Sequence, residues 1–145
     1  MTPPRLARLP PISRREKARL LVEILAIYPF ALRRMRSNDL PAMVAAARRG
    51  QRAEPVVSDP AVRAATAVRL GKAVVRSLML LPTDQRCLIR SLVLSRLLAR
   101  RGIGATLIIG VGRDDEKFEA HAWVEHEGVA LLPPGKGHFE RLLEL

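Results

Sequence analysis

Apolar side chains recur at helical spacing over the first two thirds of this chain and alternate over the last third. Positions 21, 24, 25, 28, 32 and 35 are apolar, and their three- and four-residue steps mark one face of an amphipathic helix. Ser13 and Glu16 have the spacing of a capping box. We therefore predict a helix from about Ser13 to Arg36. Pro29 lacks a backbone N–H and should kink this helix or end its first half near Tyr28.

Capping and termination signals predict three further helices. Asn38 and Asp39 precede the first, Ser58-Asp59-Pro60 precedes the second, and Gly102 follows the third as a left-handed C-cap. The expected ranges are residues 40–49, 61–80 and 87–101, with a polar linker over residues 51–57. The last helix is apolar nearly all round, which is typical of the buried central helix of a domain.

Beyond Gly102 the period changes to two, which indicates strands. We expect strands over residues 103–112, 118–125 and 129–132, joined as an antiparallel meander with a tight turn at His126-Glu127-Gly128. Residues 138–145 fit either a short helix or a strand. The predicted fold class is α+β, with a central helix packed on a small antiparallel sheet. The expected organisation is a flexible tail over residues 1–12, a helical subdomain over 13–82 and a catalytic half over 83–145, in one compact unit.

Charge is distributed unevenly along the 145 residues. Residues 1–101 carry 21 Lys and Arg against 6 Asp and Glu, whereas residues 102–145 carry 4 against 8. Such an excess suits an acidic protein, an anionic lipid surface or nucleic acid, or it is a solvated surface that reflects a bias toward Arg. The basic part has neither interleaved aromatic side chains nor a recognisable helix-turn-helix, which argues against nucleic acid.

The composition also bears on the cellular compartment of the protein and on the disulfides and cofactors that it could contain. With one Cys and three His, no internal disulfide is possible, and neither a metal nor another cofactor is expected. The N-terminal region has no apolar run of the kind found in a secretory signal, and Lys and Arg interrupt the apolar helices. A cytoplasmic protein without a transmembrane segment is therefore expected.

Cys87 and His121 are the candidate catalytic residues. Cys87 opens the central helix, where unpaired backbone N–H groups and the positive end of the helix dipole favour the thiolate. His121 lies on a predicted strand within Ala120-His121-Ala122-Trp123-Val124-Glu125. A Cys of this kind with a His on a later strand is the minimal nucleophile and base pair of a cysteine peptidase, whereas a lone Cys is more often a small buried hydrophobe. The Cys87 N–H and the Gln85 side chain are candidate oxyanion donors.

Other candidate residues each have a functional interpretation and a structural one. Trp123 shares the strand face of His121 and either walls the active-site cleft or belongs to the core. Arg90, one helical turn from Cys87, either acts on the thiol or substrate or forms a structural ion pair. His126 and His138 are interpreted as surface residues, His126 within the turn.

Several segments together resemble the leader peptidase of lasso-peptide biosynthesis, the transglutaminase-like B protein. They are Cys87-Leu88-Ile89-Arg90-Ser91-Leu92, Leu97-Leu98-Ala99-Arg100-Arg101-Gly102-Ile103, Ile109-Gly110-Val111, and the segment around His121. The similarity covers about residues 84–132, and the Leu-rich helical N-terminal segment is similar to the stand-alone protease form of that family.

The resemblance implies a cytoplasmic cysteine protease, a hydrolase of antibiotic (RiPP) biosynthesis, with Cys87 as nucleophile and His121 as general base. The substrate would be the precursor peptide, whose leader is removed so that the core's N-terminal amine is free for a separate ATP-dependent lasso cyclase. A separate leader-recognition protein would be the partner of the stand-alone form.

The family's third catalytic member, an acidic residue that orients the His, is not identifiable in this sequence. The strand after the turn should place residues 132–134 opposite His121, and no carboxylate is there. Glu119 and Glu125 share the strand face of His121, but successive positions on one face are about 7 Å apart along the strand, which is long for an orienting contact. A backbone carbonyl, a water or an acid such as Glu140 is left as the orienting group. The alternative function is a non-catalytic basic scaffold that binds partner proteins, anionic lipid or nucleic acid.

Overall fold

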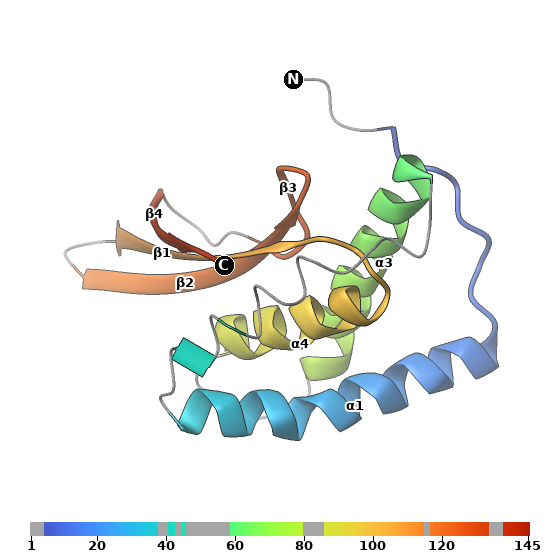
Figure 1. Cartoon of the computed structure of the whole chain (residues 1–145), viewed down its shortest axis with the longest axis horizontal. Helices are drawn as coiled ribbons and strands as arrows, with labels where there is room; N and C mark the ends of the chain where they lie inside the picture. Colours follow the sequence, from blue (N-terminus) through green and yellow to red (C-terminus); the bar gives the residue numbers. More distant parts are fainter. Residues whose placement is uncertain are drawn as a thin grey trace.

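The computed structural model describes residues 5–37, 41–42, 45, 59–79, 86–114, 117–133 and 138–145. In these parts of the chain, long helices cover residues Arg14–Arg36 (α1), Pro60–Leu78 (α3) and Arg86–Arg100 (α4). Strands cover Thr106–Asp114 (β1), Lys117–His126 (β2), Val129–Ala130 (β3) and Phe139–Glu144 (β4). Figure 1 shows α4 between the sheet and α1, with α3 beside both. The predicted α+β architecture is confirmed.

Helix α1 begins at the predicted capping box. The Ser13 N–H donates to Glu16 Oε2 at 2.8 Å, and the Glu16 N–H donates to Ser13 Oγ at 3.2 Å, so two N–H groups without helical partners are satisfied. The helix ends at Arg36 as predicted, but Pro29 does not end its first half, because the helix continues through this residue. The carbonyl that loses its partner belongs to Leu25, on the exposed side of the helix.

The other helices follow their predicted signals. Asp59 caps α3 by accepting from the Ala61 N–H at 2.9 Å, and Gly102, after α4, has a φ of 64°, which glycine tolerates without strain. Residues 41, 42 and 45 are helical. The rest of the helix predicted over residues 40–49 and the linker at 51–57 lie outside the described residues.

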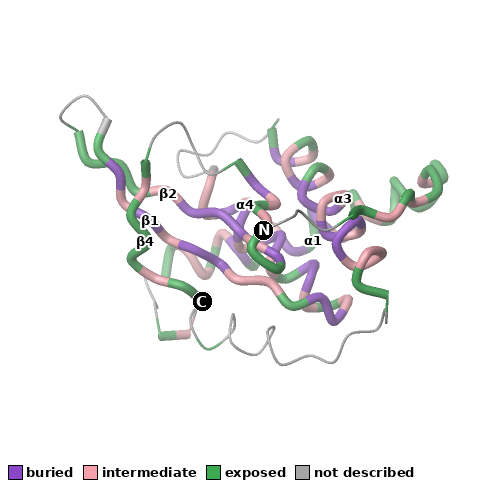
Figure 2. Tube along the Cα trace, turned by 90° about the horizontal axis from the view of Figure 1, so that it is seen from above, coloured by how far each residue is buried: buried purple, intermediate pink, exposed green. Residues whose placement is uncertain are grey.

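The sheet has four antiparallel strands in the order β3-β2-β1-β4. The expected three-stranded meander is therefore incomplete, because the C-terminal segment is a strand that pairs with β1 across a bulge at Ile109/Gly110. Strand bounds also differ from expectation: β1 begins later and ends later, at Thr106 and Asp114, β2 is one residue longer at each end, and β3 ends at Ala130. In β1 and β2, Gly110 lies opposite His121 and Ile108 opposite Trp123. Figure 2 shows burial along the middle of both strands and exposure at the end of their hairpin.

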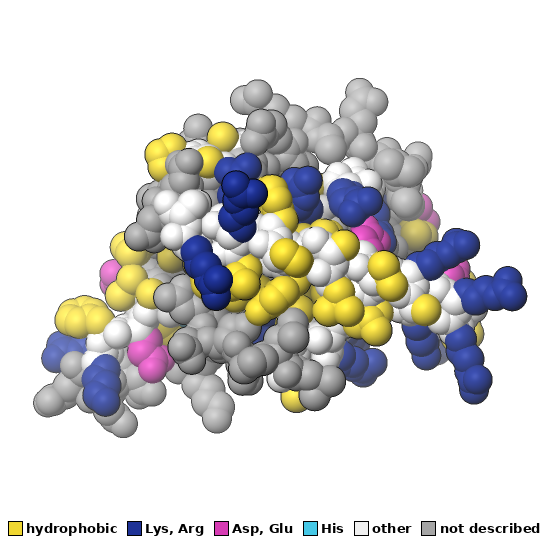
Figure 3. All heavy atoms as spheres, turned by 90° about the horizontal axis from the view of Figure 1, so that it is seen from below, with side chains coloured by type: hydrophobic (Ala, Val, Ile, Leu, Met, Phe, Trp, Pro, Cys, Tyr) yellow, Lys and Arg dark blue, Asp and Glu magenta, His cyan; other side chains and the backbone are white. Residues whose placement is uncertain are grey.

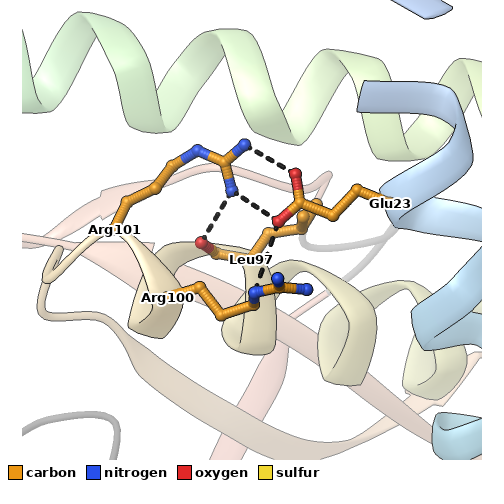
Figure 4. Close-up of polar contacts among 4 residues, drawn as sticks. All are labelled: Glu23, Leu97, Arg100 and Arg101. Carbon is orange, nitrogen blue, oxygen red and sulfur yellow. Dashed lines mark hydrogen bonds and ion pairs between the residues drawn. The ribbon is translucent and has the colours of Figure 1, made fainter. Parts of the chain in front are cut away.

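One apolar core joins the helices to the sheet. Ile89, Val93 and Leu97 of α4 are buried in it with Val74 of α3 and Ile24 of α1, consistent with the prediction that α4 is the central helix. An ionic cluster holds α1 to the end of α4: the Glu23 carboxylate accepts from Arg101 Nη2 at 2.8 Å and Nη1 at 3.2 Å, and lies 3.5 Å from Arg100 Nε (Figure 4). This ionic cluster holds the C-terminal end of α4 against α1.

Candidate functional site

Cys87 is the second residue of α4 and is half-buried. Its carbonyl accepts a hydrogen bond from Ser91 Oγ at 2.8 Å, and Ser91 itself is fully buried. The thiol thus lies in the first turn of the central helix, where backbone N–H groups lack helical partners. Gln85, the second oxyanion candidate, lies outside the described residues and stays a prediction.

His121 lies in β2, and its ring is held by a backbone group. The distance from His121 Nε2 to the Pro133 carbonyl oxygen is 2.9 Å. Because a carbonyl only accepts, Nε2 must carry the proton in this bond, and a neutral ring then keeps its lone pair on Nδ1. The imidazole is therefore prepared to accept a proton at Nδ1.

Two aromatic side chains surround the imidazole. The ring centroid of His121 lies 6.1 Å from that of Trp123, with planes inclined by 23°, and 5.3 Å from that of Phe139. Trp123 is buried, with 4% of its surface exposed. The alternatives for Trp123, cleft wall or core residue, are thus not exclusive, because it is part of the core and contacts His121. Phe139 was missed by the sequence analysis, since only the pairing of β4 with β1 brings it here.

Two glycines of β1 make room for these rings. A Cβ on Gly110 would lie 3.0 Å from Cη2 and Cζ3 of Trp123, and a Cβ on Gly112 would lie 2.7 Å from Cδ1 of Phe139. Both distances are shorter than normal carbon contacts. The alternation of glycine through Gly110-Val111-Gly112 was a signal for this close approach that the sequence analysis did not use.

A polar chain extends from Trp123 to the edge strand. Trp123 Nε1 donates to Glu125 Oε1 at 2.9 Å, and Arg141 Nη2 donates to the same oxygen at 2.8 Å. Arg141 also donates to Glu144, and this hydrogen bond, with the nearby charge of Glu125, raises the pKa of the guanidinium. Glu125 is therefore bound to Trp123 and Arg141, so it orients the indole and not the imidazole.

The Pro133 carbonyl occupies the position at which the third catalytic member was sought. It lies within residues 132–134, as the turn geometry predicted, and it supplies a backbone acceptor where the family's acid is expected. Glu140 lies opposite Val111 in the sheet, and therefore on the other face from His121. Glu119 is exposed. Of the groups considered, the backbone carbonyl is the one that bonds His121.

The other polar residues considered from the sequence have different outcomes. His126 was interpreted as a surface residue in the turn, which is wrong: it ends β2, is 5% exposed, and its Nδ1 lies 2.6 Å from the Gly104 carbonyl oxygen. Arg90 Nε is buried without a hydrogen-bond partner among the described residues, and both alternatives for Arg90 stay predictions. His138 is exposed, as predicted.

The described hydrogen bonds of His121 do not include one to Cys87, and the role of this pair stays a prediction. Over the same part of the chain, no group of three His, Cys, Asp or Glu side chains is placed to hold a metal ion. None of the described helices is both long and apolar enough to cross a membrane.

Comparison with known proteins gives one match. Neither a curated protein nor a solved structure matches the chain. Residues 24–144 match the family described as the Transglutaminase-like superfamily, in which cysteine protease and acyltransferase activities are common. Because the match spans far more than half of the 145 residues, this chain belongs to the transglutaminase-like superfamily.

Proposed function

We propose that this chain is a cysteine peptidase in which the thiolate of Cys87 attacks a peptide carbonyl and His121 moves the protons. The observation that carries the proposal is the bond from His121 Nε2 to the Pro133 carbonyl. It fixes the proton on Nε2 and leaves Nδ1 as the base. Membership of a superfamily in which this chemistry is common supports the assignment.

The lengths of the two elements support an encounter between thiol and imidazole. The bond between His126 Nδ1 and the Gly104 carbonyl ties the end of β2 to the segment that follows α4. From this joint, Cys87 lies about 20 Å back along α4 and His121 about 17 Å back along β2, at 1.5 and 3.3 Å per residue. Helix α4 and strand β2 are in contact and run in the same direction (Figure 1). Cys87 and His121 should therefore lie at similar distances from this joint, on adjacent elements.

In the proposed reaction, His121 Nδ1 takes the proton of the Cys87 thiol, and the sulfur bonds to the carbonyl carbon. The backbone N–H of Cys87 is placed at a helix N-terminus, where it can stabilise the developing oxyanion. The imidazolium then protonates the leaving amine, the peptide bond breaks, and a thioester forms. Water attacks the thioester with its proton passing to His121, and the thiol and a carboxylate product are released.

The proposed substrate is the precursor of a lasso peptide, cleaved between leader and core. Four segments between Cys87 and Glu125 resemble the leader peptidase of that pathway. The partners that follow from the resemblance are the precursor peptide, a separate leader-recognition protein and an ATP-dependent cyclase that uses the freed amine.

A second candidate is a non-catalytic basic scaffold. Two observations favour it: among the described residues no hydrogen bond joins Cys87 to His121, and a backbone carbonyl stands where the family has an acid. The excess of Lys and Arg in residues 1–101 would then be the functional surface.

The test is mass spectrometry of a leader-core peptide incubated with this chain, with and without the recognition protein. We expect a leader fragment with a free carboxylate and a core fragment with a free amine. Cys87→Ala should abolish both products and leave the circular dichroism spectrum unchanged. Cleavage by Cys87→Ala at the wild-type rate would rule out the nucleophile, and an absence of cleavage in every condition would favour the scaffold.

A further inference from the structure

An apolar groove lies far from Cys87, between the N-terminal segment 5–12, the first half of α1 and α3. Its volume is about 610 Å³, and all three segments contribute to its walls. The N-terminal segment is fixed on α3 by two hydrogen bonds: the Ala7 N–H donates to the Ala61 carbonyl at 3.4 Å, and Arg69 Nη2 donates to the Pro10 carbonyl at 2.8 Å. The groove is therefore built from held segments and is large enough for several side chains of a ligand.

Among the described residues that line this groove, four are cations and none has an acidic or aromatic side chain. They are Lys17 of α1 and Arg69, Lys72 and Arg76 of α3. Among the described residues, none of the four forms an ion pair. Glu16 lies close enough to Arg69 for the two charges to interact, but its carboxylate accepts from the Ser13 N–H. The groove thus combines an apolar floor with uncompensated positive charge, which is complementary to an anionic, partly apolar ligand.

The spacing of the cations indicates a ligand with several charges. Arg69, Lys72 and Arg76 follow one another at three- and four-residue steps, so they form a row about 10 Å long on one face of α3. A single carboxylate or phosphate head group would contact only part of this row. The described lining has no aromatic side chain on which the bases of a single strand could stack. An acidic peptide segment with apolar residues between its acidic ones fits both features.

We propose that this groove is a docking site for an acidic amphipathic segment of a partner protein or peptide. The α1 side of the molecule continues the apolar floor outward: Leu21 lines the groove and is 44% exposed, and Figure 3 shows apolar side chains along α1 among Lys and Arg side chains. The groove lies at the N-terminal end of α1, whereas the N-terminus of α4 lies toward the opposite end (Figure 1). Docking of the segment in this groove would raise the affinity of the chain for that partner and leave the proposed catalytic residues unobstructed.

The probe is a fluorescein-labelled synthetic peptide built from repeats of Leu-Glu-Glu-Leu, with binding followed by fluorescence anisotropy. We expect Lys72→Glu combined with Arg76→Glu to weaken binding by at least about tenfold, because two favourable charge pairs become repulsive. Both side chains are exposed and make no hydrogen bond in the described part of the chain, so the variant should fold. Leu21→Asn should also weaken binding, because it removes an apolar contact without adding charge.

The matched controls carry the same changes outside the groove. Val22→Asn alters an exposed neighbour that does not line it, and Arg113→Glu with Lys117→Glu reverses two exposed charges on the β1–β2 hairpin. Both should bind within about twofold of wild type. Wild-type affinity in the Lys72/Arg76 variant would overturn the proposal. An equal loss of affinity in the hairpin control would overturn it in favour of diffuse attraction by net charge.

Two further outcomes would assign the groove to another occupant. Vesicles containing phosphatidylglycerol that bind through Lys72 and Arg76, with no binding of the peptide, would make it a lipid site. A dimer in size-exclusion chromatography that the Lys72/Arg76 variant dissociates would make it a contact between copies of this chain. The proposal does not depend on the peptidase reaction. We therefore expect Cys87→Ala to bind the probe as wild type does.

Discussion

The imidazole of His121 and the indole of Trp123 lie stacked, with ring centroids 6.1 Å apart. The indole is in turn held by Glu125 through Nε1, and Glu125 by Arg141. A side chain of the edge strand is thus connected, through two intermediates, to the proposed base. We propose Trp123, Glu125 and Arg141 as positioning residues, because in the proposed reaction they would act only through His121.

Replacing Trp123 should therefore change turnover more than substrate binding. We expect Trp123→Ala to lower kcat by about 10-fold to 100-fold with little change in KM, because a misplaced base loses its alignment with the thiol while the substrate still binds. Trp123→Phe keeps an aromatic ring beside the imidazole and should recover most of the loss. An unchanged kcat in Trp123→Ala, or a loss that Trp123→Phe does not recover, would contradict the positioning role.

The space beneath the indole can be tested at Gly110. Gly110→Ala places a methyl group 3.0 Å from two ring carbons of Trp123, and we expect it to lower the free energy of unfolding by about 1–3 kcal/mol, the usual effect of overpacking. Gly104→Ala is the matched control, since a Cβ there meets no heavy atom within 4 Å. Urea denaturation measures both. Equal stability of the two variants would show that the indole can shift without cost.

The reactivity of Cys87 tests the thiol and imidazole pairing without a substrate. If His121 acts as the proposed base, an electrophilic reagent such as iodoacetamide should label wild-type Cys87 quickly at neutral pH, because the imidazole would take the thiol proton as the sulfur reacts. His121→Ala should slow labelling by about tenfold or more, whereas His138→Ala, at an exposed histidine, should not. Slow labelling of the wild-type protein would identify a packed, unactivated thiol.

Local signals in the sequence predicted the helix boundaries well. The capping box at Ser13 and Glu16, the Asp59 cap and the left-handed Gly102 each act within a few residues of the chain, so the sequence contains the whole interaction. The turn at Glu127 and Gly128, with φ of 49° and 78°, was also predicted. Because these two residues alone form it, His126 stays in β2 and is buried.

Contacts between distant segments could not be predicted in the same way. The segment 139–144 has adjacent leucines that suit a helix as well as a strand, and only its pairing with β1 decides the outcome. That pairing brings Phe139 to His121. The turn predicted that residues 132–134 lie opposite His121, but not which group there binds the imidazole, because every residue has a carbonyl and only the fold selects Pro133.

The contact between α1 and α4 should contribute measurably to stability. Glu23 is four-fifths buried and accepts from both terminal nitrogens of Arg101, which also donates to the Leu97 carbonyl (Figure 4). We expect Glu23→Gln to lower the free energy of unfolding by about 1–2 kcal/mol, because charge-assisted bonds in a partly buried site are lost. Glu127→Gln, at an exposed carboxylate 4.0 Å from Arg63, should change it by less than about 0.5 kcal/mol. A double-mutant cycle with Arg101→Gln that shows no coupling would contradict the contact's role.

The capping box of α1 should make the start of this helix sensitive to acid. Hydrogen bonds to the backbone and side chain of Ser13 lower the pKa of Glu16 from its usual value of 4.5. A carboxyl whose pKa is lower in the folded state stabilises that state above its unfolded pKa, and the effect is lost as the pH falls through the folded pKa. Thermal unfolding followed by circular dichroism should therefore show a drop in Tm below about pH 4.5 that is smaller in Glu16→Gln, because glutamine has no proton to bind.

Above that pH the Glu16→Gln variant should melt at a lower temperature than wild type. Since Glu16 is exposed, high salt should leave the hydrogen-bonded part of the effect and remove the part due to Arg19 and Arg69. Identical pH dependence in the two proteins would mean that the carboxylate does not cap the helix in solution.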